Sequence, residues 1–280
     1  MEGSSSTSAS EGEILPPLGG AVHVPDVEPG EVRVERSRRR RGVDLLAAPG
    51  TYCLLGINIA VFVWMVWRGV SVQSPTPTDL VRFGATDLNL MLNGGQWYRL
   101  LTATFVHVGW IHLATNMWCL WNLGLLGEPL IGPYGLVAVY LLTGVAGNLL
   151  SMAVNVIARN YESVGAGASG AVFGIAGILI VLLSNKKLPI PWEELRRLRR
   201  SVIQFAVLNL VIGVAATSSR LVLIDNFAHV GGFLSGLAMG VPLTPRMTAG
   251  RVRYFQRQRL VFAGTALLLS LFGYWIANLR

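Results

Sequence analysis

The sequence has few charged residues for its length. Asp, Glu, Lys and Arg together make up 14% of the 280 residues, whereas hydrophobic residues make up 52%. Soluble domains typically contain about 25% charged residues, so this composition excludes an ordinary water-soluble enzyme. The chain is therefore predicted to reside in a lipid bilayer.

Cysteine is scarce as well. Cys53 and Cys119 are the only two, and they fall in different apolar segments at different predicted depths. A structural disulfide is therefore not expected, and no motif around either residue indicates a thiol nucleophile. We interpret both side chains as packing residues.

The apolar residues are gathered into seven blocks, several of them close to the ~20 residues that cross a hydrocarbon core. The blocks cover residues 52–67, 101–126, 134–157, 168–184, 202–217, 226–243 and 260–277. They predict an all-α fold, a polytopic membrane bundle of seven helices. The fifth block is short and contains Asn209 and Gly213.

Basic residues predict the orientation of these helices. Most of the 23 Lys and Arg residues precede the first block or follow the fourth and sixth blocks. Because basic loops stay on the cytoplasmic side, this pattern places the N-terminus in the cytoplasm and the C-terminus on the outer side. The run RSRRRR at 36–41 is interpreted as a topology anchor that contacts anionic lipid, and nucleic acid is not expected as a partner.

Composition divides the chain into three parts. Residues 1–45 are predicted to be a disordered basic cytoplasmic tail, because their first 32 residues are rich in Ser, Gly, Pro and Glu. Residues 46–243 form the predicted six-span core, including a long first loop at 69–100. Trp97, Tyr98 and Arg99 in that loop suit the membrane interface. Residues 244–280 comprise a cytoplasmic loop and the seventh transmembrane helix.

Polar side chains inside the apolar blocks are the first candidates for function, because burying them in a bilayer is costly. Ser169 and His229 lie within the first few residues of the fourth and sixth blocks, which both enter from the outer face. His112 and Asn116, one helical turn apart, share a face of the second block and are expected to lie deeper. His107 is expected to have a structural or loop-facing role.

Glycine spacing predicts which helices meet. Gly170 and Gly174 in the fourth block, and Gly232 and Gly236 in the sixth, are four residues apart, as small residues are where two helices approach closely. Close contact would bring the Ser169 hydroxyl and the His229 imidazole together as nucleophile and general base. Backbone N–H groups near Ser169, with the side chains of His112 and Asn116, could hold an oxyanion.

The segments GAGASGAVFG, AHVGGFLSG, HVGWIHLATNMW and WYRLLTATF resemble the signature segments of the rhomboid intramembrane serine proteases, in the same order. The resemblance implies Ser169 as nucleophile, His229 as base, and His112 and Asn116 as oxyanion donors. It also implies that Gly167 and Phe173 pack at the substrate site and that Glu128 is the family's acidic residue after the second span.

The same resemblance implies a rhomboid-like six-helix core plus one C-terminal transmembrane helix. It implies no cofactor, no metal and no nucleotide, with single-span transmembrane proteins as substrates. An inactive relative that binds transmembrane helices as a chaperone or scaffold is the main alternative. A metalloprotease is disfavoured because no HExxH motif is present, and a transporter because no intramembrane carboxylate or internal repeat is evident.

Overall fold

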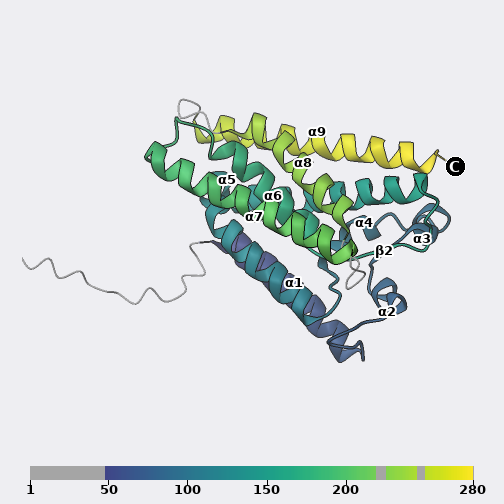
Figure 1. The fold of residues 1–280 in the computed structure, drawn as a ribbon. Coiled ribbons are helices and arrows are strands. Elements are labelled where there is room, and N and C mark those ends of the chain that lie inside the picture. Colours follow the sequence, from purple (N-terminus) through teal and green to yellow (C-terminus); the bar gives the residue numbers. More distant parts are fainter. Residues whose placement is uncertain (1–47, 219–224, 245–249, 280) are drawn as a thin grey trace, which may run out of the picture. The chain divides into compact units, whose positions relative to one another are not determined.

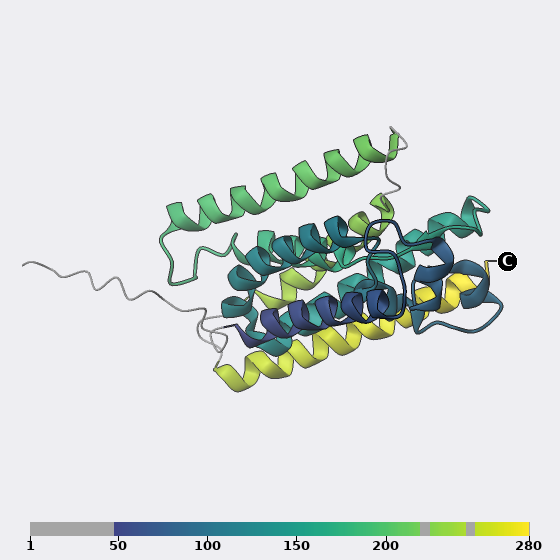
Figure 2. The ribbon, with the colours of Figure 1, turned by 90° about the horizontal axis from the view of Figure 1, so that it is seen from below.

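The computed structural model describes residues 48–218, 225–244 and 250–279. The predicted tail and the RSRRRR run lie outside this part of the chain. The described residues are mainly helical, and the long helices lie side by side (Figures 1 and 2). The six longer helices are α1 (Pro49–Trp67), α5 (Trp110–Ile157), α6 (Ser169–Leu182), α7 (Trp192–Ser218), α8 (Asn226–Leu243) and α9 (Arg251–Ala277).

Three of these helices, α1, α5 and α9, are long and apolar enough to cross a membrane by length and composition, and α6 is a shorter apolar helix. The chain is thus an integral membrane protein with a helical fold. The number of spans and their orientation stay predictions.

Helix α5 contains two of the predicted spans. Its backbone leaves the helical conformation at Gly132, where φ is 76° and ψ is 166°, and Pro133 follows. The second segment folds back beside the first, as shown by a Cβ atom at Gly127, which would lie 3.6 Å from the Leu136 side chain. In a straight helix these two residues would be about 13 Å apart along the axis.

The predicted first residue of the second span differs from the first residue of the observed helix. The apolar block begins at residue 101, but α5 begins at Trp110, after α4 (Arg99–Thr102), a 3₁₀ turn (Ala103–Phe105) and Gly109 at φ 96°. Hydropathy does not distinguish these elements from a continuous helix. His112 therefore lies in the first turn of α5, and not ten or more residues along its helix as the apolar block predicts.

A buried carboxylate caps the N-terminus of helix α1. Glu128, which is 3% exposed, accepts hydrogen bonds from the backbone N–H groups of Gly50 and Thr51 at 2.8 and 2.7 Å and from the Thr51 hydroxyl at 2.7 Å. The first N–H groups of a helix have no partner within the helix and carry partial positive charge, so a carboxylate stabilises them.

Helix α9 forms hydrogen bonds to the backbone of α5 next to its bend. The buried Gln258 side chain of α9 donates to the carbonyl of Ile131 at 2.7 Å. The Tyr254 hydroxyl lies 3.4 Å from the Leu130 carbonyl and 3.3 Å from the Leu243 carbonyl. These carbonyls lie at the ends of helical segments, where no further turn supplies a donor.

The loop predicted at 69–100 has its own structure. It contains α2 (Pro77–Arg82), β1 (Thr86–Asp87) and α3 (Leu88–Leu92) and leads into α4. Strand β1 pairs antiparallel with β2 (Val164–Gly165), with Thr86 opposite Gly165, so one short two-stranded ladder joins this loop to the segment before α6. Arg99, expected at the interface, is 6% exposed and donates to the carbonyls of Val81 and Ala85.

Candidate active site

Helices α6 and α8 touch at the two glycine pairs, as their spacing predicts. A Cβ atom at Gly232 would overlap the Gly170 carbonyl oxygen, and one at Gly236 would overlap the Gly174 carbonyl oxygen. The backbones therefore meet without side chains between them. This contact brings the segment around Ser169 against the segment around His229.

We expect Gly236→Ala to lower the free energy of unfolding by about 2 kcal/mol, because the added methyl group must push the two backbones apart. Gly264→Ala in α9 is the matched control, since no atom lies within 4 Å of its added Cβ. Thermal denaturation in detergent micelles measures both. A Gly236→Ala protein as stable as the control would contradict the close contact.

Ser169 is the first residue of α6 and is half-buried. The chain reaches it through Gly167, whose φ of 133° favours glycine and whose N–H donates to the Ala103 carbonyl at 2.9 Å. A Cβ at Gly167 would lie 2.6 Å from the His112 ring. Glycine is thus required both by the backbone conformation and by the neighbouring imidazole.

His229 lies in the first turn of α8 and is 6% exposed. Its ring stacks on Phe173, with centroids 4.5 Å apart and planes inclined by 10°. Phe173 follows Ser169 by four residues, one turn further along the same face of α6. The imidazole of His229 therefore packs on the α6 face that begins at Ser169.

The hydroxyl–imidazole pair is not hydrogen-bonded in this structure. Nδ1 of His229 is buried and has no hydrogen-bond partner, and within the described part of the chain the Ser169 hydroxyl has none either. Such bonds are often long in a free enzyme and tighten when substrate binds. Both groups are thus available for new hydrogen bonds.

His112, in the first turn of α5, packs against Gly167. Its Nδ1 accepts from the Val108 N–H at 3.4 Å, which favours a proton on Nε2 and makes that nitrogen a donor. On α6, a Cβ atom at Gly170 would lie 3.2 Å from the carbonyl oxygen of Ala228, the residue before His229. The first turns of α5, α6 and α8 thus meet at one end of the bundle.

Asn116 is buried one turn beyond His112, and its amide donates to the His112 carbonyl at 2.8 Å. One amide hydrogen therefore remains for a ligand.

His107 is fully buried, with Nδ1 3.1 Å from the Phe105 carbonyl and its ring 5.4 Å from that of His112. Nε2 of His107 has no partner.

Asp225 is a site residue that the sequence analysis did not single out. Its carboxylate accepts from the Ala228 N–H at 3.0 Å and from the Ser151 hydroxyl, so it caps α8 and joins it to the second segment of α5. An Asp immediately before the first residue of an apolar helix is a known helix-start signal. Ser151 could not be identified in this way, because the contact spans 74 residues.

Comparisons with known proteins agree on one family. The Rhomboid domain model matches residues 94–246. Rhomboid protease GluP of Bacillus subtilis is 35% identical over 69% of this chain, which covers only 35% of that protein. RHOMBOID-like protein 6, mitochondrial, of Arabidopsis thaliana is 31% identical, and 78% of this chain covers 76% of it.

A third relative, Rhomboid-like protease 2 of Toxoplasma gondii, is 29% identical over 73% of this chain and 68% of its own length. The domain match extends from the segment before α4 to the end of α8, which includes Ser169, His229, His112 and Asn116. This chain belongs to the rhomboid family.

Proposed function

We propose that this protein is an intramembrane serine endopeptidase that hydrolyses peptide bonds in or near the transmembrane segments of single-span membrane proteins. Ser169 is the nucleophile and His229 is its general base. The observation that carries the proposal is the packing of the buried His229 ring on Phe173, one helical turn from Ser169. The family's protease relatives support the same reaction class.

In this mechanism His229 accepts the Ser169 hydroxyl proton while the oxygen attacks the scissile carbonyl carbon. The tetrahedral oxyanion accepts hydrogen bonds from the Ser169 N–H and from the side chains of His112 and Asn116. The C–N bond then breaks, His229 donates its proton to the leaving amine, and an ester on Ser169 remains. A water molecule, deprotonated by His229, hydrolyses this acyl-enzyme and frees Ser169.

The membrane arrangement belongs to the same proposal. Residues 46–243 form six spans with the N-terminus in the cytoplasm, and residues 244–280 add a cytoplasmic loop and a seventh span. This topology places the first turns of α5, α6 and α8 at the outer surface, where water can reach the dyad. The two segments of α5 count as the second and third spans.

A fluorophosphonate probe tests the nucleophile directly. Incubation with the full-length protein in detergent is expected to modify Ser169, as read by mass spectrometry of peptides, and Ser169→Ala should abolish labelling. Ser235→Ala is the matched control, because the Ser235 hydroxyl already donates to the Gly232 carbonyl at 2.8 Å. A folded wild-type protein that takes no label at Ser169 would favour a non-cleaving scaffold.

A further inference from the structure

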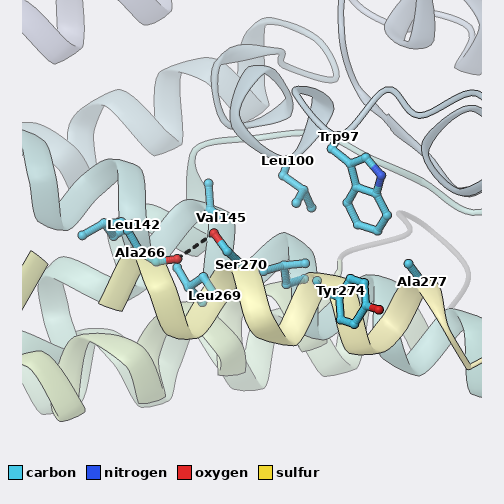
Figure 3. A pocket seen from close by; sticks show the side chains of 11 residues that line it. Trp97, Leu100, Leu142, Val145, Ala266, Leu269, Ser270, Tyr274 and Ala277 are labelled. Carbon is cyan, nitrogen blue, oxygen red and sulfur yellow. Dashed lines mark hydrogen bonds between the residues drawn. The ribbon is translucent and has the colours of Figure 1, made fainter. Parts of the chain in front are cut away.

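An apolar groove lies away from the candidate active site, between α9, the second segment of α5 and the loop before α4. Its volume is about 430 Å³. Figure 3 shows Trp97 and Tyr274 facing each other near one end, with Leu142 and Ala266 at the other. None of the residues assigned to catalysis lines it.

The groove follows one face of α9. The lining residues on that helix recur every three or four positions, at Ala266, Leu269, Ser270, Gly273, Tyr274 and Ala277. This is the spacing of a single helical face. At ~1.5 Å per residue the face is about 16 Å long, which is roughly half of the ~30 Å hydrocarbon core. The groove therefore has the length of one lipid leaflet.

The opposite wall is formed by Leu142, Val145 and Leu149, again on one helical face. The hydroxyl of Ser270 donates to the Ala266 carbonyl at 2.9 Å, so it requires no polar ligand. The lining is thus apolar along its length. Trp97 and the exposed Tyr274 carry polar groups at one end, as aromatic residues do at the level of lipid headgroups.

The width of the groove decides between possible occupants. A Cβ atom added at Gly273 of α9 would lie 3.5 Å from the Leu149 side chain and 3.7 Å from the Trp97 ring, which are ordinary van der Waals contacts. At this point the space between the α9 backbone and the facing walls is therefore about as wide as one methyl group. A helix with its side chains is about 10 Å or more across, so the groove is too narrow for a transmembrane helix and suits a single hydrocarbon chain.

We propose that this groove binds one acyl chain of a membrane glycerophospholipid, in the leaflet that contains the C-terminal half of α9. The chain lies along α9 and α5, and the headgroup lies beside Trp97 and Tyr274. Leu100, which is 9% exposed, closes the groove from the loop side. The bound lipid then joins the last helix to the loop that carries β1.

Photolabelling of the full-length protein in phosphatidylcholine vesicles tests the proposal. The vesicles contain phosphatidylcholine with a diazirine on its acyl chain, and adducts are located by mass spectrometry of peptides. Adducts are expected to be several-fold more frequent at Leu142 and Val145 than at Leu267 and Leu271, which are exposed on α9. Equal labelling at both places would overturn the proposal, because it would indicate ordinary bilayer contact.

Two glycines of α9 provide a matched pair of variants. A Cβ at Gly273 would lie 3.5 Å from Leu149 and 3.7 Å from Trp97, whereas no atom lies within 4 Å of a Cβ at Gly264. Gly273→Phe should therefore fill the groove and reduce labelling of Leu142 and Val145 several-fold, and Gly264→Phe should leave it unchanged. Size-exclusion chromatography and thermal melting report whether each variant is folded.

Should Gly273→Phe fail to fold, Ala266→Phe fills the groove from its other end and is expected to have the same effect. Unchanged labelling in a folded groove-filling variant would overturn the proposal. A photoreactive amino acid placed at Leu142 or Val145 tests the other occupants. Crosslinks from it to a second copy of the chain or to a substrate helix would also overturn the proposal. Peptide cleavage is not a readout, so the result is independent of the proposed protease activity.

Discussion

Ser169→Ala is expected to abolish cleavage of a transmembrane model substrate, with a rate loss of at least about 10⁴-fold. Without the hydroxyl oxygen no acyl-enzyme can form. The variant should otherwise be unchanged, because the Ser169 hydroxyl forms no hydrogen bond within the described residues. Its free energy of unfolding is therefore expected to stay within about 0.5 kcal/mol of the wild type.

The measurement is the rate of product formation from a fluorescent single-span substrate in vesicles, with thermal melting in parallel. His229→Ala should be equally inactive, but less stable, because it also removes the stacked contact with Phe173. Asn116→Ala should lose only about 10²-fold, since one of several oxyanion donors contributes about 3 kcal/mol. Cleavage that persists in Ser169→Ala would refute the assigned nucleophile.

Glu128→Ala is expected to lower the free energy of unfolding by about 4 kcal/mol, the largest stability loss that we predict. The substitution leaves the N–H groups of Gly50 and Thr51 and the Thr51 hydroxyl without their acceptor, at a buried position. It also removes the negative charge that faces the N-terminus of α1. Equilibrium unfolding in mixed detergent micelles, followed by circular dichroism, measures the loss.

Glu193→Ala is the control for this experiment, because Glu193 is exposed in the first turn of α7. Its effect should be within about 0.5 kcal/mol. Glu128→Gln should fall between the two, because the amide keeps one acceptor oxygen but loses the charge. Equal stabilities of the Glu128→Ala and Glu193→Ala proteins would show that the carboxylate does not hold the start of α1.

The contact between α6 and α8 was predictable from the sequence, whereas the residue at which α5 begins was not. The four-residue spacing of Gly170 with Gly174, and of Gly232 with Gly236, is a local pattern that correctly predicts contact between α6 and α8. The place of His112 along its helix was mispredicted, because residues 101–109 belong to the predicted apolar block but contain the end of α4, a 3₁₀ turn and the bend at Gly109. Hydropathy measures the preference for lipid and does not report where a backbone changes direction.

By itself the sequence determined that this chain is a helical membrane protein, because burial in a bilayer demands long apolar segments and makes each polar side chain within them conspicuous. It also determined the candidates Ser169, His229, His112 and Asn116, which stand out for the same reason. Only the tertiary structure decided how the helix ends are satisfied. The carboxylate of Glu128 reaches Thr51 across 77 residues, and Gln258 reaches Ile131 across 127. Such hydrogen bonds follow from which unpaired backbone groups the folded chain brings together, and no local pattern encodes that choice.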